Sequence, residues 1–218
     1  MPKVTEVSRQ KKNSKRFNVF LDGQFAFGAD EDLVVSFRLI PGKVIDSLDL
    51  EKILFEAEVG KLMDRIYGLL GRRGRSEKEI RDYLRQLSFK RKIKGGEEIS
   101  DLIIGKVIEK LVEKRLINDY QFAYDWVESR GKSRGKNILK AELYKKGIDR
   151  EVIDQVLDEL EDPKKEEILV ESLINKKISS WKNLNDLEFK KKAFSYLGRR
   201  GFSFDLISET IEKYLKKR

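Results

Sequence analysis

Basic side chains gather at three comparable places in the sequence, and the chemistry open to them is the binding of anions. Two of these groups lie at the entry to a helix-like segment, and the third lies on such a segment and just after it. The candidate binding residues are Arg72, Arg73, Arg75, Arg81, Arg130, Lys132, Arg134, Lys136, Lys140, Arg199 and Arg200. Guanidinium and ammonium groups bind phosphate and carboxylate oxygens, so clusters of them favour nucleic acid or another anionic partner. The alternative is that the clusters are solvated faces; their recurrence at equivalent places favours the binding interpretation without removing that alternative.

The overall charge agrees with an anionic partner. The 218 residues include 47 Lys and Arg against 38 Asp and Glu, which gives a formal net charge of +9 at pH 7. Charged residues make up 39% of the chain, where about 25% is usual for a globular domain. Hydrophobic residues also make up 39%, which is enough to build cores and argues against wholesale disorder. This composition is typical of helical bundles or repeats with small cores and much surface.

The residues that many enzymes need are missing. The chain has neither cysteine nor histidine, which excludes disulfides, thiol catalysis, Ser-His-Asp triads and most zinc and haem sites. Its carboxylates are mostly spaced to pair with nearby basic residues along helices, and no pair has the pattern of a metal or acid–base site. We therefore expect no enzyme, no catalytic residue, no metal and no cofactor.

One short motif could suggest nucleotide binding, but its context excludes it. Gly131-Lys132-Ser133 matches the end of a phosphate-binding P-loop. That loop needs a glycine five residues before its last glycine, and this position holds Trp126. No strand precedes the motif either. Trp126 instead shares a helical stripe with Phe122, Ala123 and Val127, which predicts that it anchors a core; Tyr124 lies off the stripe and is the better candidate for an exposed aromatic.

Residues 1–46 differ from the rest of the chain and predict a small β-rich extension. Apolar and polar residues alternate over Phe17–Leu21, and Asp22-Gly23 separates them from Gln24–Gly28. Asp-Gly between such runs predicts a hairpin with a type I′ turn. Lys3–Ser8 is a candidate third strand. A short helix is expected over Asp30–Phe37.

From Ser47 onward the pattern is helical and repeats itself. Capping residues recur, as in Ser76 with Glu79, Asn118 with Gln121 and Asn185 with Glu188. Apolar residues at positions i, i+1, i+4, i+5 and i+8 recur after Ser100, Asp149 and Ser203, each time as the last helix of a group of three. First helices are expected around Leu62–Leu70, Gln121–Val127 and Glu166–Ile178. The fold class predicted is mainly α, with three tandem three-helix repeats in an elongated array and a β-rich N-terminal extension.

The expected domains follow this repeat. Residues 1–46 form the extension, 47–117 the first repeat, 118–161 the second and 162–218 the third. The first repeat carries a basic insertion at 88–98, which contains the sequence KRKIKGG and predicts an exposed loop. No apolar run approaches the roughly 20 residues of a membrane span, and the basic N-terminus lacks the apolar segment of a signal peptide. We therefore expect a cytoplasmic monomer with no membrane contact.

Three functions remain open at the level of residues. The repeats could bind nucleic acid through its backbone within a larger assembly. They could be helix-turn-helix readers of DNA sequence, although no helix is rich in Asn, Gln and Arg at base-reading spacing. They could also form a helical adaptor with no role in nucleic-acid binding.

The ordered set of motifs resembles the bacterial RecX family. The segments that carry the resemblance are LLGRRGRSEKEIRDYL (69–84), IND (117–119), FAYDWVESR (122–130), LKAELYKKGI (139–148) and YLGRRGFSFDLI (196–207). The hairpin FNVFLDGQFAFG (17–28) resembles the N-terminal extension of the longer members. The resemblance covers nearly the whole chain.

The resemblance implies a regulatory protein rather than an enzyme. Members of this family modulate the RecA recombinase: they bind in the groove of the RecA–DNA filament and block its growth or promote its disassembly. They thereby lower its ATPase, strand-exchange and coprotease activities, in recombination, DNA repair and the SOS response. The partners implied are the RecA filament and, weakly and without sequence preference, single- and double-stranded DNA. The candidate basic residues named above are the positions to which the family's basic residues map.

Overall fold

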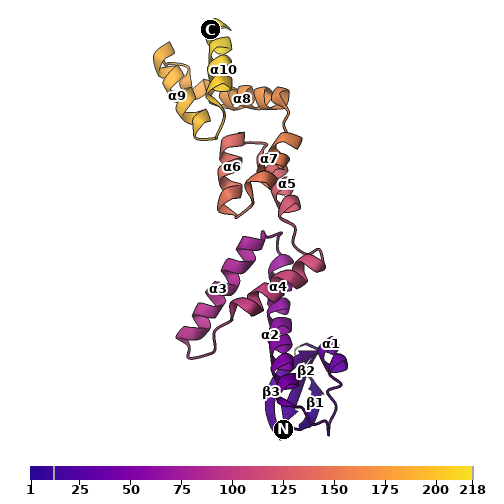
Figure 1. Cartoon of the computed structure of the whole chain (residues 1–218). Coiled ribbons are helices and arrows are strands. Elements are labelled where there is room, and N and C mark those ends of the chain that lie inside the picture. Colours follow the sequence, from indigo (N-terminus) through magenta and orange to yellow (C-terminus); the bar gives the residue numbers. More distant parts are fainter. Residues whose placement is uncertain (12, 218) are drawn as a thin grey trace. The chain divides into compact units, whose positions relative to one another are not determined.

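The N-terminal segment is a three-stranded antiparallel sheet in the order β1-β2-β3. The computed structural model describes residues 1–11 and 13–217 (Figure 1). The strands are β1 (Val4–Arg9), β2 (Arg16–Leu21) and β3 (Gln24–Asp30). Asp22 and Gly23 between β2 and β3 have φ values of 48° and 83°, as the two central residues of a type I′ turn require. The predicted hairpin and the predicted third strand are both confirmed.

One face of this sheet carries the first hydrophobic core. Val4, Val19 and Ala29 are buried there against α1 (Glu31–Ser36) and the first half of α2 (Ser47–Leu70). Ile53 and Ala57 are the buried residues that α2 contributes. Arg16 of β2 is also buried, because its guanidinium donates to Asp64 of α2 at 2.5 Å and to the Gly28 carbonyl at 2.9 Å. The sheet is thus attached to α2 by both apolar contacts and a polar pair.

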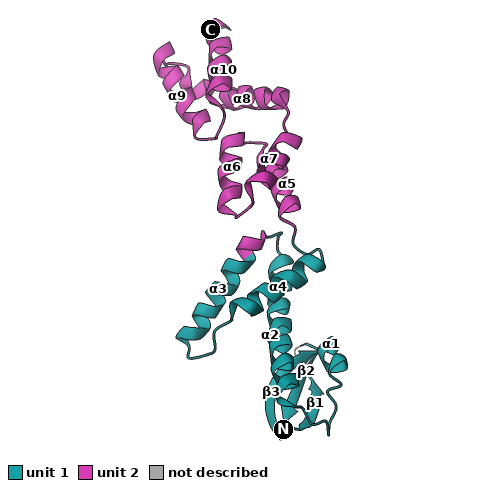
Figure 2. Ribbon diagram, in the orientation of Figure 1, with its two compact units in different colours: residues 1–75, 80–117 teal, residues 76–79, 118–218 magenta. Residues whose placement is uncertain are grey.

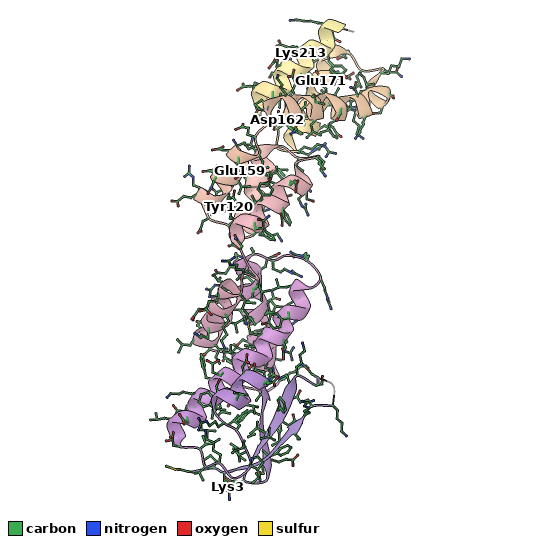
Figure 3. All side chains as sticks on the ribbon, turned by 90° about the vertical axis from the view of Figure 1, so that its right-hand side faces the viewer. Lys3, Tyr120, Glu159, Asp162, Glu171 and Lys213 are labelled. Carbon is green, nitrogen blue, oxygen red and sulfur yellow. The ribbon has the colours of Figure 1, made fainter. Side chains whose placement is uncertain are left out.

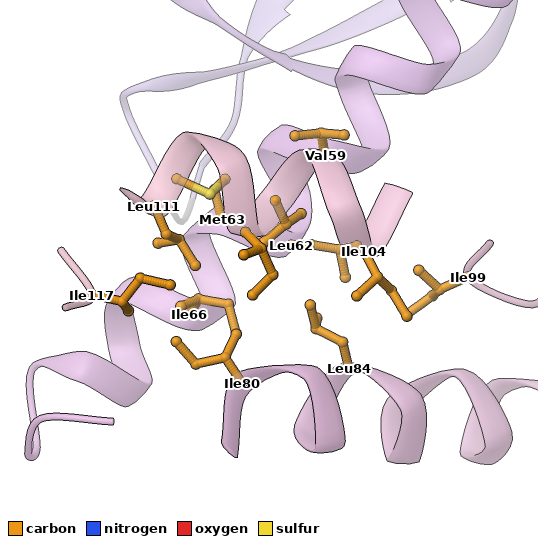
Figure 4. Packing of buried hydrophobic residues seen from close by; sticks show 12 residues of the cluster. Val59, Leu62, Met63, Ile66, Ile80, Leu84, Ile99, Ile104, Leu111 and Ile117 are labelled. Atoms are coloured by element: carbon orange, nitrogen blue, oxygen red, sulfur yellow. The ribbon is translucent and has the colours of Figure 1, made fainter. Parts of the chain in front are cut away.

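The second half of α2 begins a second core with α3 (Glu77–Ile93) and α4 (Asp101–Glu113). Figure 4 shows how its apolar side chains converge from the helices. Leu62 and Ile66 of α2, Ile80 and Leu84 of α3 and Leu111 of α4 are all nearly inaccessible to solvent. α2 is therefore much longer than the expected helix around Leu62–Leu70, because its first turns cover the sheet.

The predicted loop at 88–98 is partly wrong. α3 continues through Ile93, so that only residues 94–100 leave the helix before α4 begins. Ser88 is buried, and its hydroxyl oxygen accepts a hydrogen bond from the Ile99 N–H at 2.9 Å. Arg91 forms an ion pair with Glu58 of α2. These contacts explain why a segment with the composition of a loop extends the helix instead.

The chain divides into two compact units (Figure 2). The first unit comprises residues 1–75 and 80–117, and the second comprises 76–79 and 118–218. The second unit holds two groups of three helices. Its helices are α5 (Asp119–Arg130), α6 (Lys136–Lys145), α7 (Arg150–Glu159), α8 (Pro163–Ile178), the 3-10 turn η1 (Ser179–Trp181), α9 (Asp186–Gly198) and α10 (Phe204–Lys217). No strand lies within the described residues after Ser47. The mainly helical fold class is confirmed, while the boundaries of the four domains expected from the repeat stay a prediction.

The helix starts in the second unit follow the predicted capping residues. Asn118 accepts from the Gln121 N–H at 3.1 Å, and Asp162 accepts from the Lys165 N–H at 3.1 Å with Pro163 at the first helical position. Asn185 and Glu188 form a complete capping box. In a further polar contact within this unit, the Tyr120 hydroxyl of α5 donates to Glu159 of α7; both residues are labelled in Figure 3. Local capping therefore sets where these helices begin.

Two glycines form the junction between the two helix groups of the second unit. The Gly135 N–H before α6 donates to the Arg200 carbonyl after α9 at 2.7 Å, and the Asn137 N–H donates to the Gly201 carbonyl at 3.1 Å. A Cβ at Gly135 would lie 2.5 Å from the Gly201 oxygen, and one at Gly201 would lie 2.5 Å from the Ile138 nitrogen. Gly201 also has a φ of +86°. Neither position can carry a side chain without moving the backbone.

A similar contact between a helix start and a helix end occurs a second time in this unit. Ser76, whose hydroxyl accepts from the Glu79 N–H, donates to the Lys146 carbonyl at 2.7 Å. Gly147 follows with a φ of +79°, and a Cβ there would lie 2.4 Å from the Lys78 side chain. Ser76 and Gly135 thus stand at equivalent helix starts, and Lys146-Gly147 and Arg200-Gly201 at equivalent helix ends.

We predict that Gly201→Ala destabilises the protein. The left-handed backbone alone costs about 1–3 kcal/mol for a residue with a side chain, and the overlap with Ile138 adds to this cost. The matched control is Gly198→Ala three residues earlier, where a Cβ would meet nothing within 4 Å. Thermal melting followed by circular dichroism should show a clear loss for the first variant and none for the second. Equal melting temperatures would mean that the junction can relax.

Candidate functional site

The candidate basic residues of the first unit lie on the turn after α2 and along α3. Arg72 is exposed, and the Arg73 guanidinium donates to the Gly74 carbonyl at 2.9 Å. Arg75 is half-buried, and its Nε atom is inaccessible without a hydrogen-bond partner. Arg81 is half-buried on α3. Arg72 and Arg73 are therefore the exposed members of this group.

The candidate residues around the turn from α5 to α6 are mostly engaged in ion pairs. Arg130 and Arg134 both contact the carboxylate of Glu142. Lys136 contacts Asp158 at 3.1 Å and Glu161 at 3.2 Å, and Lys140 contacts Asp154, whose pKa it holds below the ordinary value by hydrogen bonding. Lys132 is exposed and makes no ion pair within the described residues. The carboxylates of α6 and α7 thus neutralise most of this predicted cluster.

Trp126 packs against the core of this helix group, as predicted, but from its edge. Ala123 and Val127 are the buried residues of α5, whereas Trp126 and Phe122 are half-buried at the edge of the core and stack with ring centroids 5.7 Å apart. The Trp126 indole N–H donates to Glu142 at 2.9 Å, and Arg130 lies over its ring at 4.1 Å. The indole needs a polar partner for its N–H, which explains its place at the boundary of the core.

Arg200 lies beside the turn from α5 to α6. Its guanidinium donates to the Ser133 carbonyl at 3.2 Å, and its own carbonyl accepts from Gly135. It also lies over the Tyr196 ring, 4.6 Å from the centroid. The structure therefore joins Arg200 to the turn from α5 to α6, and Arg134 after this turn lines the same surface hollow, although the sequence placed the two arginines in different repeats. Arg199 is exposed and lines the surface next to it.

Two adjoining hollows on the second unit contain cations that the candidate set omitted. One is lined by Lys177, Lys191, Lys192, Tyr196 and Arg199 among others, and the other by Arg134, Tyr196, Arg199 and Arg200 with Ile138. Tyr196 and Arg199 belong to both. Lys191 and Lys192 are visible in the sequence as part of a basic run on α9. Only the fold shows that both of them border a hollow.

A different, amphipathic hollow lies between the two helix groups of the second unit. Val127, Leu139, Leu157 and Leu169 form its apolar part, and Glu166 lies among the polar residues at its border. Burial raises the pKa of the Glu166 carboxyl above its ordinary value, although the Lys136 N–H donates to it. The carboxylate form of Glu166 is therefore disfavoured in the folded protein.

Comparison with known proteins assigns the chain to a family. Residues 2–46 match the RecX N-terminal domain, 118–157 the second RecX three-helix domain and 166–211 the third. Regulatory protein RecX of Bacillus velezensis is 38% identical over 216 residues, which cover 98% of this chain and 78% of that protein. The chain belongs to the RecX family. RecX of Bacillus subtilis strain 168 is also 38% identical, over 218 residues that cover 98% of this chain and 77% of the relative.

Solved RecX structures have the same fold. A crystal structure of regulatory protein RecX aligns with a TM-score of 0.77 at 24% identity, covering 98% of this chain and all of that one. RecX from Lactobacillus salivarius aligns with a TM-score of 0.61 at 26% identity, covering 71% of this chain and 95% of the other. RecX proteins are regulatory and non-enzymatic. Within residues 1–11 and 13–217, no acidic cluster could hold a metal ion and no helix could cross a membrane.

We predict that Glu142→Gln lowers stability. Glu142 is the shared acceptor for Arg130, Arg134 and the Trp126 indole, and its side chain is 20% exposed. Glutamine keeps an acceptor for the indole but loses the charge that both guanidiniums contact, which should cost about 1–2 kcal/mol. Glu128→Gln on the exposed face of α5 is the control and should change little. Urea unfolding of both variants measures the difference; equal midpoints would contradict the prediction.

We also predict that Glu166→Gln raises stability at neutral pH. Because the folded pKa lies above that of the unfolded chain, about 4.3, the folded state binds the proton more tightly. The stability that comes from this tighter proton binding is fully present below the unfolded pKa and is lost as pH rises through the folded pKa. Glutamine avoids the loss, so its advantage should appear above the folded pKa and vanish below pH 4. Melting temperatures measured from pH 3.5 to 7 test this, and a less stable variant at pH 7 would disprove it.

Proposed function

We propose that this RecX protein binds the RecA–DNA filament and inhibits its extension, ATPase, strand exchange and coprotease activity. The observation that carries the proposal is 38% identity to Regulatory protein RecX over nearly the whole chain. A net charge of +9 agrees with a partner that contains nucleic acid. The partners in this proposal are the RecA filament and, weakly and without sequence preference, single- and double-stranded DNA. The site of action is the cytoplasm, and the protein acts as a monomer.

The candidate residues differ in how well they suit this role. Lys132, Arg199 and Arg200 support it best, because none of them makes an ion pair within the described residues. Arg130, Arg134, Lys136 and Lys140 already contact carboxylates of their own unit, so a partner would have to compete with those pairs. Arg72, on the first unit, remains accessible for the same partner.

The two other functions are less well supported. A helix-turn-helix reader needs a recognition helix whose polar face is open to base edges. The last helix of the second repeat, α7, instead directs Asp154 and Asp158 to lysines of α6. A helical adaptor without a role in nucleic-acid binding does not account for the group of unpaired cations on the third repeat.

We expect inhibition of RecA well below one molecule per RecA protomer. Blocking the growing end of a filament affects many protomers at once, so ATPase on single-stranded DNA should fall at a small fraction of stoichiometry. The measurement is steady-state ATP hydrolysis by RecA during titration with the protein. Inhibition that appears only at one molecule per protomer would favour coating of the groove, and no effect at saturation would reject the proposed function.

A further inference from the structure

The two adjoining hollows of the third repeat form one continuous cationic surface. We name this surface, lined by Lys177, Lys191, Lys192, Arg199 and Arg200 around Tyr196, the α9 surface. Lys177 comes from α8 and the two lysines from α9, while Arg199 and Arg200 follow the end of α9. Lys191, Lys192 and Arg199 are exposed, so their charged groups are available to a ligand.

The charge of the α9 surface is not neutralised by the residues that the structure describes. Arg134, which also lines one hollow, pairs with Glu142, but none of the five named cations makes an ion pair in the described part of the chain, and no acidic side chain lines either hollow. This contrasts with Arg130, Arg134, Lys136 and Lys140, each of which contacts a carboxylate. Like charges held close together repel, so the arrangement is tolerated by the fold rather than stabilising it.

Among the described residues, Arg200 has no carboxylate partner because an isoleucine stands where the equivalent position of the other junction has a glutamate. At the junction built by Ser76, Lys146 contacts Glu79 at 2.5 Å, three residues after the serine. At the junction built by Gly135, the residue three positions later is Ile138, which lines the hollow beside Arg200. Glu79 therefore neutralises Lys146 after α6, whereas Ile138 at the equivalent position leaves Arg200 after α9 without a carboxylate.

Aromatic rings hold two of these cations in place. Arg200 lies 4.6 Å and Lys177 5.7 Å from the centre of the Tyr196 ring. Trp181 packs edge-on against Tyr196 with 5.7 Å between the ring centres. The hydrogen bond from Arg200 to the Ser133 carbonyl further restricts its guanidinium. Side chains restrained in this way lose less entropy when they bind an anion.

We propose that the α9 surface binds the phosphate backbone of a nucleic-acid strand. This inference rests on the proposed function, and it identifies which part of the protein contacts the DNA rather than the recombinase. Adjoining hollows with several cations, no carboxylate and the hydroxyl of Ser195 suit a chain of evenly charged phosphates. An acidic protein surface also carries some lysines and arginines. These would be repelled by the cations of the α9 surface, which offers no carboxylate to pair with them. The contacts are to the backbone, so they carry no sequence preference.

The test is oligonucleotide binding by the full chain without recombinase. A fluorescent single-stranded oligonucleotide is titrated with the wild type and with the triple variant Lys191→Ala, Lys192→Ala, Arg199→Ala at several salt concentrations. We expect affinity to fall about tenfold at low salt and the dependence of log K on log[salt] to weaken by about 2, since each lost phosphate contact contributes about 0.7 on single strands.

Two further variants separate the site from net charge and from folding. Lys145→Ala, Lys164→Ala, Lys176→Ala removes the same charge from exposed, unpaired positions of the same unit and should bind like the wild type. Lys191→Arg, Lys192→Arg, Arg199→Lys keeps the charge and should also bind normally. Circular dichroism checks that all are folded. Wild-type affinity in the first triple variant, equal losses in the control, or no binding by the wild type would each overturn the inference.

RecA ATPase assays on the same proteins distinguish this inference from the proposed function. A triple variant that binds the oligonucleotide normally but no longer inhibits RecA would mean that the α9 surface contacts the recombinase, which also overturns the inference. A wild type that inhibits RecA while the triple variant keeps its affinity preserves the function and rejects the DNA site. A wild type that binds DNA through the α9 surface without inhibiting RecA rejects the function and preserves the site.

Discussion

Gly135 and Gly201 approach so closely that neither position has room for a Cβ, and the second unit depends on this contact. Each of its two helix groups has a small core, with eight buried residues in the first and nine in the second. Groups of this size are marginal alone and gain stability from their neighbours. The junction supplies backbone hydrogen bonds at the start of α6, a helix end where free N–H groups would otherwise be left. It also brings the basic turn of one group against Arg200 of the next.

Charge pairing, rather than charge density, separates the basic residues of the second unit into two sets. The turn from α5 to α6 and the end of α9 look alike in sequence, because both are rich in arginine and lysine. In the structure, the first lies among carboxylates of α6 and α7, while among the described residues no carboxylate lines the hollows at the second. The pairs beside α6 add little stability each, being partly exposed, but together they leave that turn close to neutral. Around α9, several cations without a carboxylate partner in the described residues line the same surface.

The features predictable from the sequence are those set by neighbours along the chain. The Asp22-Gly23 turn, the caps at Asn118 and Asn185 and the apolar stripes of the last helices depend on local geometry, and the structure confirms them. The length of α3 was not predictable, because Ser88 and Arg91 are held by Ile99 and Glu58, far along the chain. The position of Trp126 depended on Glu142, sixteen residues away. For the candidate site, sequence identified basic clusters but not their ion pairs, which are tertiary contacts.

The two helix groups of the second unit share one arrangement with opposite electrical outcomes. In each, an aromatic ring contacts one cation near the end of the first helix and one just after the second helix. Trp126 contacts Arg130 and Lys146, and Tyr196 contacts Lys177 and Arg200. Around Trp126, Glu142 and Glu79 take up the charge of these cations. Around Tyr196 the described residues provide no such carboxylate, and the ring restrains the cations together with the hydrogen bond from Arg200 to the Ser133 carbonyl. Since the packing needs only the ring and the aliphatic stems, the carboxylates can be absent without loss of the fold, and their absence leaves the restrained cations around Tyr196 open to an external anion.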